Sequence, residues 1–121
     1  MKLKTAKIIV ETFEDTNRRW ERALKGKIVT HTNEEIISVG SFEILGKLFS
    51  PQRLEILSKI FILKPKSIAE LARKLHRDFK NVHTDVKFLA DIGLIELREE
   101  GARKTMVPIA KFSNIEVPLA S

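Results

Sequence analysis

The stretch from Ser67 to Gly93 constrains the fold of this chain more than any other, because two amphipathic helices adjoin in it. Ser67 and Glu70 have the spacing of a capping box, in which the serine hydroxyl and the glutamate carboxylate satisfy free backbone N–H groups. Apolar residues then recur at helical spacing, namely Ile68, Leu71, Ala72 and Leu75. The first helix is therefore predicted to have one apolar face and to end near His76.

A second helix is predicted over residues 78–92, directly after a tight turn at residues 76–78. Its apolar positions are Phe79, Val82, Val86, Leu89 and Ile92, and Gly93 follows where a helix end commonly requires a positive φ angle. The side chains between them donate hydrogen bonds or carry positive charge, namely Lys80, Asn81, His83, Thr84 and Lys87. A helix with such an outer side is a candidate to lie in the major groove of DNA.

A β-hairpin is predicted immediately after this second helix. Residues 94–98 alternate between apolar and polar side chains, residues 99–104 form a charged turn, and residues 105–109 run back. Two helices followed by a hairpin make up the winged helix-turn-helix arrangement. The predicted fold is therefore α+β and mainly helical, with a three-helix core, a hairpin wing and an N-terminal strand–helix extension.

Three segments resemble winged helix-turn-helix transcriptional regulators. Residues 77–89 match the signature R-D-x-K-N-V-H-x-D-x-K-x-L, residues 41–55 match an SF-E-L-G-LFSP-RLE lead-in, and residues 115–119 match a closing I-E-V-P-L. The chain is most similar to a small group of predicted archaeal and bacterial regulators, some of which are described as antitoxin-like. The resemblance covers most of the chain and implies a DNA-binding regulator.

The remaining segments predict shorter elements. Strands are expected at residues 8–10, at residues 36–39 and at the sheet edge near residues 115–119, where Pro118 cannot donate to a central ladder. Helices are expected at residues 13–24, at residues 42–49 behind a Ser41 cap, and from Ser50-Pro51 to Leu63. We divide the chain into an extension at 1–40, a possible dimer contact, and a winged helix-turn-helix domain at 41–121.

Charge and composition narrow the class of protein. The 121 residues include 22 basic and 16 acidic side chains, giving a net charge of +6, and the pI is about 9.7. A pI this high is typical of nucleic-acid binders, although it also suits membrane surfaces or acidic partners. There is no cysteine, and no apolar run is long enough to span a bilayer. We expect a cytoplasmic protein that does not contact the membrane.

The candidate DNA contacts follow from side-chain chemistry. Asn81 pairs well with adenine, Lys80 and Lys87 with guanine or phosphate, and Thr84 with a thymine methyl group. His83 suits a phosphate or packing against the neighbouring helix, and Asp85 a partner within its own helix. Arg77 in the turn is expected at a phosphate, and the wing would contribute Arg98, Arg103 and Lys104. Glu99 and Glu100 would hold the wing arginines or mark a wing that faces a protein.

The sequence predicts a sequence-specific regulator that binds double-stranded DNA as a homodimer, acting as a repressor through the helix at 78–92. One alternative is an antitoxin-like regulator that also binds a toxin-like partner, and another is a winged helix used only for protein contacts. We expect no enzyme, because His31, His76 and His83 are scattered without metal-ligand spacing. Neither a cofactor nor a metal is expected.

Overall fold

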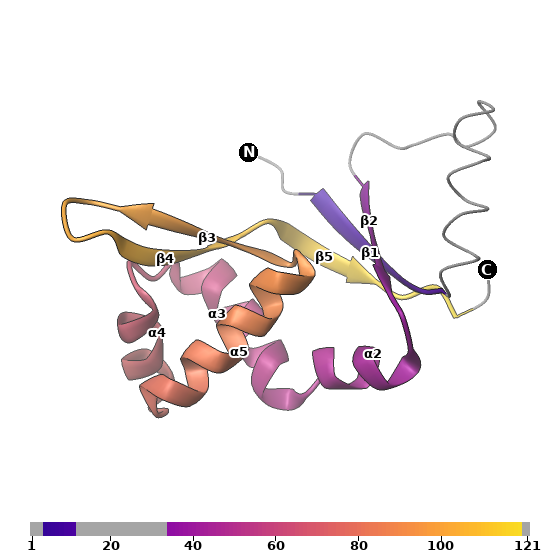
Figure 1. The fold of residues 1–121 in the computed structure, drawn as a ribbon, viewed down its shortest axis with the longest axis horizontal. Coiled ribbons are helices and arrows are strands. Elements are labelled where there is room, and N and C mark those ends of the chain that lie inside the picture. Colours follow the sequence, from indigo (N-terminus) through magenta and orange to yellow (C-terminus); the bar gives the residue numbers. More distant parts are fainter. Residues whose placement is uncertain (1–3, 12–33, 120–121) are drawn as a thin grey trace.

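The computed structural model describes residues 4–11 and 34–119, and this part of the chain has an α+β fold (Figure 1). Its elements in order are β1 (Lys4–Val10), β2 (Glu34–Val39), α2 (Phe42–Leu48), α3 (Pro51–Leu63), α4 (Ile68–Leu75), α5 (Phe79–Ile92), β3 (Ile95–Glu100), β4 (Thr105–Ala110) and β5 (Phe112–Glu116). The helix predicted at residues 13–24 and the residue His31 lie outside the described residues.

The strands form two sheets. One is a parallel three-stranded sheet in the order β2-β1-β5, and the other is the antiparallel hairpin β3-β4. Figure 1 shows that β4 leads almost directly into β5, which joins the two sheets. Helices α3, α4 and α5 lie below the hairpin in this view, and α2 lies below the three-stranded sheet.

Strand β1 is the centre of the parallel sheet. It pairs with β2 along one edge and with β5 along the other, so both of its edges are used within the chain. Its side chains Ala6 and Ile8 are fully buried, as expected for alternate residues on the inner face of a strand. The edge strand predicted near residues 115–119 is confirmed in part, because β5 lies at the sheet edge but spans Phe112–Glu116 and ends before Pro118.

The described helices and strands share one hydrophobic core. The largest fully buried side chains are Ile8, Leu48, Ile56, Ile60, Leu71, Leu89, Leu94, Val82 and Val86. The apolar positions that predicted α4 and α5 supply six of the fifteen buried residues of this core. Phe79 is the exception, because half of its surface is exposed at the start of α5. The prediction that Phe79 belongs to the buried face is wrong.

Serine hydroxyls start three of the helices. Ser41 accepts a hydrogen bond from the Ile44 N–H, Ser50 from the Arg53 N–H, and Ser67 from the Glu70 N–H. Each side chain satisfies a backbone donor that would otherwise have no partner in the first helical turn. All three caps were predicted, as was Pro51 at the first position of α3.

Two local predictions are corrected by the structure. The hairpin turn is shorter than expected, because Glu99 and Glu100 belong to β3 and only residues 101–104 turn. Of the two hydrogen bonds of the predicted capping box, the described contacts include only the one from the Glu70 N–H to the Ser67 hydroxyl. The Glu70 carboxylate pairs with Nζ of Lys74 at 3.2 Å, one turn further along α4. None of the described helices is both long and apolar enough to cross a bilayer.

Candidate functional site

The turn between α4 and α5 sets the direction of α5. His76 adopts the left-handed conformation with φ 55°, which histidine tolerates better than most side chains. The His76 N–H then donates to the Arg73 carbonyl, and the Arg77 N–H donates to the Ala72 carbonyl. This pair of hydrogen bonds closes the end of α4 as a Schellman motif. Asp78 caps the next helix by accepting from the Asn81 N–H, so the two helices are joined by a defined turn.

The outer side of α5 carries a row of exposed polar residues. Lys80, Thr84 and Lys87 are spaced by four and three residues, and they lie opposite the buried residues Val82 and Val86. The Thr84 hydroxyl donates to the Lys80 carbonyl at 3.0 Å, which turns that hydrogen towards the helix backbone. Nζ of Lys87 lies 3.3 Å from Oδ1 of the exposed Asp91. Lys80 has no ion pair among the described contacts. We call Lys80, Thr84 and Lys87 the outer row.

Asn81 and His83 flank the outer row on its two sides, and both are exposed. The Asn81 side-chain amide has no hydrogen bond among the described contacts. The His83 ring lies 5.7 Å from the Phe79 ring, centroid to centroid, one turn earlier on the same helix. The alternative that His83 packs against a neighbouring helix is therefore corrected, because its ring contact is within α5.

Asp85 faces away from the outer row and joins three segments. Its Oδ2 accepts a hydrogen bond of 2.9 Å from Nη2 of Arg77, and its Oδ1 lies 3.3 Å from Nε of Arg53 on α3. The Asp85 side chain is only 15% exposed. Its partners come from α3 and from the turn, so the expected partner within α5 is wrong. Arg77 is therefore engaged by Asp85, whereas the sequence suggested a phosphate contact.

Arg53 is the second partner of Asp85, and no local sequence pattern marked it as a site residue. Its Nη1 donates to the Lys47 carbonyl at 2.6 Å, near the end of α2. Its guanidinium carbon lies 3.9 Å from the centroid of the Phe88 ring on α5, within range of a cation–π interaction. Arg53 thus links α2, α3 and α5 behind the outer row.

The hairpin extends beyond the helices and has a basic tip. Arg103 and Lys104 are exposed in the turn, and neither has an ion pair among the described contacts. Gly101 and Lys104 both have positive φ angles, and the Lys104 N–H donates to the Gly101 carbonyl at 3.1 Å. Arg98 pairs with Glu96 at 3.3 Å. The expectation that Glu99 and Glu100 hold Arg98 is therefore wrong.

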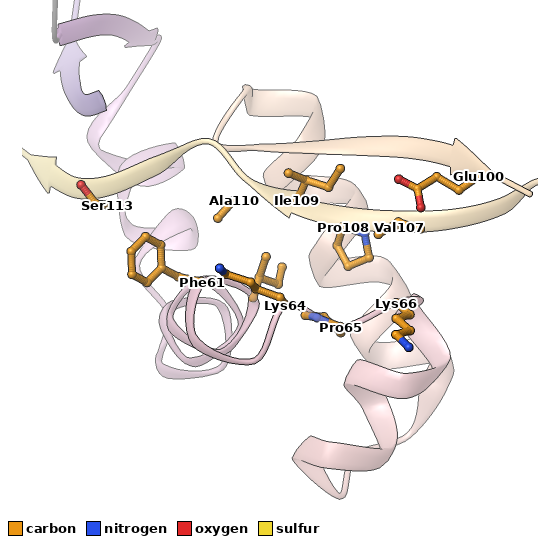
Figure 2. A pocket seen from close by; sticks show the side chains of 11 residues that line it. Phe61, Lys64, Pro65, Lys66, Glu100, Val107, Pro108, Ile109, Ala110 and Ser113 are labelled. Atoms are coloured by element: carbon orange, nitrogen blue, oxygen red, sulfur yellow. The ribbon is translucent and has the colours of Figure 1, made fainter. Parts of the chain in front are cut away.

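A groove lies between α3 and β4. Figure 2 shows Phe61, Pro65, Val107, Pro108 and Ile109 along it, with Lys64 and Lys66 near one wall and Glu100 on β3. Its volume is about 800 Å³. The sequence did not predict this groove, because its walls come from segments more than thirty residues apart.

Within residues 4–11 and 34–119, no group of three or more His, Asp or Glu side chains could hold a metal ion. The site is instead a polar helix face, held by partly buried ion pairs, beside a hairpin tip that carries Arg103 and Lys104. A family model described as HVO_A0114 matches residues 48–117, from the end of α2 to just beyond β5. The chain belongs to this HVO_A0114 family. No curated protein and no solved structure is significantly similar to it.

Proposed function

We propose that this protein is a winged helix-turn-helix regulator that binds double-stranded DNA sequence-specifically. Helices α3, α4 and α5 would be the three-helix core, α5 the reading helix, and the hairpin β3-β4 the wing. The observation that carries the proposal is the outer row on α5. A helix whose exposed side donates hydrogen bonds and positive charge suits the major groove, which is about 12 Å wide and admits an α-helix.

The roles of the residues on α5 follow from where each side chain lies. Asn81 has a free amide that can pair with adenine through two hydrogen bonds. Lys80 and Lys87 would contact guanine or phosphate, and the Thr84 methyl group would meet a thymine methyl. His83 stacks beside Phe79 and would approach a phosphate at the edge of the groove. In this proposal the residues on the helix face read the bases, and the residues at its edges contact phosphates and so position the protein on the duplex.

Arg77 has a different role from the one its sequence position suggested. The Arg77 guanidinium pairs with the Asp85 carboxylate, so we propose that Arg77 positions α5. Lys80, at the start of the same helix, would then supply the phosphate contact. Arg103 and Lys104 at the tip would reach the neighbouring backbone or minor groove. A net charge of +6 favours such contacts, and their number sets the salt dependence of binding.

We propose that the regulator acts as a homodimeric repressor that occupies a promoter. One reading helix contacts few base pairs, and a two-fold pair doubles the site. DNA binding would rest mainly on residues 41–121, and β1 would support them by pairing with β5. The proposal requires no cofactor, metal or catalytic residue. Strand β1 pairs with β2 along one edge and with β5 along residues 4–7 of the other, so an antitoxin-like contact would use mainly other surfaces.

The test is fluorescence anisotropy of the full chain with its own upstream DNA and with a scrambled duplex, across a salt series. Tighter binding to the upstream DNA would support a specific regulator. Equal binding to both duplexes would leave a non-specific DNA binder and contradict the proposal. No binding at moderate salt would favour a winged helix used only for protein contacts.

A further inference from the structure

Helix α3 is apolar on two opposite sides. Ile56 and Ile60 are buried in the core, whereas Leu54, Phe61 and Ile62 on the outer side are 42%, 42% and 63% exposed. The three exposed residues surround Ser58, which lies at the centre of the outer side by helical spacing. An apolar stripe on a helix is normally covered by another element. The outer side of α3 therefore lacks a covering surface within the described residues.

Two grooves border this outer side. The groove of Figure 2 separates α3 from β4, and a second one of about 470 Å³ separates α3 from β5. Phe61 lines both grooves, and Leu54 and Ile62 line the second one. Leu54, Phe61 and Ile62 therefore project beside two grooves. Helices pack by placing the side chains of one into the grooves of the other, so this surface suits packing against a helix.

We infer that a second copy of this chain covers α3, with the two α3 helices packed antiparallel across a two-fold axis at Ser58. Leu54 and Ile62 lie four residues before and after Ser58, so the axis brings Leu54 of each copy beside Ile62 of the other. A two-fold interface requires this kind of self-complementary pattern. The small Ser58 side chain at the centre allows the two helices to approach closely.

The charged residues beside the apolar outer side of α3 also favour the antiparallel pairing of two α3 helices. Glu55 and Lys59 lie on one edge of it, and neither forms an ion pair among the described contacts. In the antiparallel arrangement this edge faces its own copy, and Glu55 comes opposite Lys59 of the other chain. Two equivalent ion pairs then form across the axis. A parallel two-fold pair would place this edge of the two copies on opposite sides of the interface, where the ion pairs could not form, so the pattern selects the antiparallel arrangement.

The pairing leaves the candidate site accessible. The outer row of α5 lies opposite the side of α5 that packs on the core, and α3 contacts α5 through that same core. Figure 1 shows α5 in front of α3, so a copy packed on the outer side of α3 would not cover the outer row. The inference agrees with a dimeric regulator but does not depend on DNA binding, because its test uses free protein.

The first test is disulfide cross-linking of the full chain, which contains no cysteine. Ser58→Cys places two thiols at the axis and is expected to form a cross-linked dimer rapidly under mild oxidation. Ala102→Cys, exposed at the hairpin tip, measures the rate of random collision. Equal rates for the two variants would overturn the inference. So would a wild-type chain whose mass by light scattering stays at 13.9 kDa at micromolar concentrations.

The second test uses substitutions on the surface. Ile62→Glu is expected to raise the dimer dissociation constant more than about tenfold, since it places a charge in an apolar contact. Phe42→Glu alters an equally exposed apolar residue on α2 and is expected to leave the dimer intact. Glu55→Lys and Lys59→Glu should each weaken dimerisation, and the double variant should restore it. A double variant as weak as the two single ones would contradict the antiparallel arrangement.

Discussion

Nη2 of Arg77 lies 2.9 Å from Oδ2 of Asp85, which fastens the turn after α4 to the middle of α5. The same carboxylate faces Arg53 on α3, so one acidic group sets the position of α5 relative to two other segments. The direction of the candidate reading helix therefore depends on residues that do not belong to its exposed face. These ion pairs hold α5 in place rather than contacting a ligand. Their loss is therefore expected to lower the free energy of unfolding.

Asp85→Ala is expected to lower the free energy of unfolding by about 2 kcal/mol, because two half-buried guanidinium groups lose their shared acceptor. Chemical denaturation followed by circular dichroism measures the change. Asp91→Ala is the matched control, since its pair with Lys87 on the same helix is exposed and is expected to contribute less than about 1 kcal/mol. Similar losses for both variants would show that the Asp85 ion pairs stabilise the fold no more than an exposed ion pair does.

Lys80→Ala is expected to weaken binding to upstream and scrambled DNA alike. It should also reduce the slope of log K against log salt by about 1, the value for one lost phosphate contact. Arg77→Ala is expected to leave this slope unchanged, because its guanidinium is engaged by Asp85. Lys4→Ala, on β1, controls for the general loss of one positive charge. A reduced slope for Arg77→Ala would return that residue to the phosphate contact that its sequence position suggested.

Asn81→Ala is expected to reduce the preference for upstream over scrambled DNA by about 1–3 kcal/mol, the discrimination that one bidentate base contact provides. Competition anisotropy with both duplexes measures it. Asn114→Ala removes an exposed amide from β5 and should leave the preference unchanged. An unchanged preference in Asn81→Ala would exclude Asn81 as a base reader, whatever its effect on overall affinity.

Hydrogen bonding from Lys74 lowers the pKa of the Glu70 carboxyl below its ordinary value of 4.5. A carboxyl whose pKa falls on folding stabilises the protein above its unfolded pKa and loses that effect as the pH drops through the folded pKa. Glu70→Gln is therefore expected to be less stable than wild type near neutral pH, with the difference disappearing in acid. Thermal unfolding across pH checks this. In a Lys74→Gln background the substitution should have a smaller effect at neutral pH, and an effect of the same size would assign the shift to another group.

Gly93→Ala is expected to destabilise the protein by about 1 kcal/mol, because Gly93 ends α5 with φ 99° and an L side chain is strained there. No atom lies within 4 Å of an added Cβ, so the effect comes from the backbone alone. Gly46, inside α2, is equally free of neighbours but has no positive φ. Gly46→Ala is expected to stabilise by up to about 1 kcal/mol. Thermal melts of the two variants should therefore shift in opposite directions.

The helix boundaries were predictable because their determinants are local. Ser41, Ser50 and Ser67 bond to N–H groups three residues away, and Gly93 ends α5 through its own φ angle. The same holds for the hairpin, whose strands are separated by a short turn. Each helix cap, helix end and hairpin turn is therefore determined by residues within a few positions of one another in the sequence.

The long-range features were not predictable in the same way. Nothing in the sequence near Arg53 indicates Asp85 or Phe88, which reach it only after α3 and α5 pack. The pairing of β1 with β5, from opposite ends of the chain, has no local signal either. Phe79 fits the apolar spacing of α5, yet it lies in the first turn, where the core no longer covers it. The ion pair of Arg77 with Asp85 has no local signal in the sequence, because it depends on how the helices pack.

The position of β1 between β2 and β5 also determines the order in which the protein can be completed during synthesis. β1 is synthesised before β5, yet one of its edges stays unpaired until β5 has been made. The helices and the hairpin depend on contacts between neighbouring segments, which form quickly, whereas strand pairing between distant segments is slow. The helices α3, α4 and α5 and the hairpin can therefore assemble before the sheet closes, and a nascent chain that lacks β5 exposes one edge of β1.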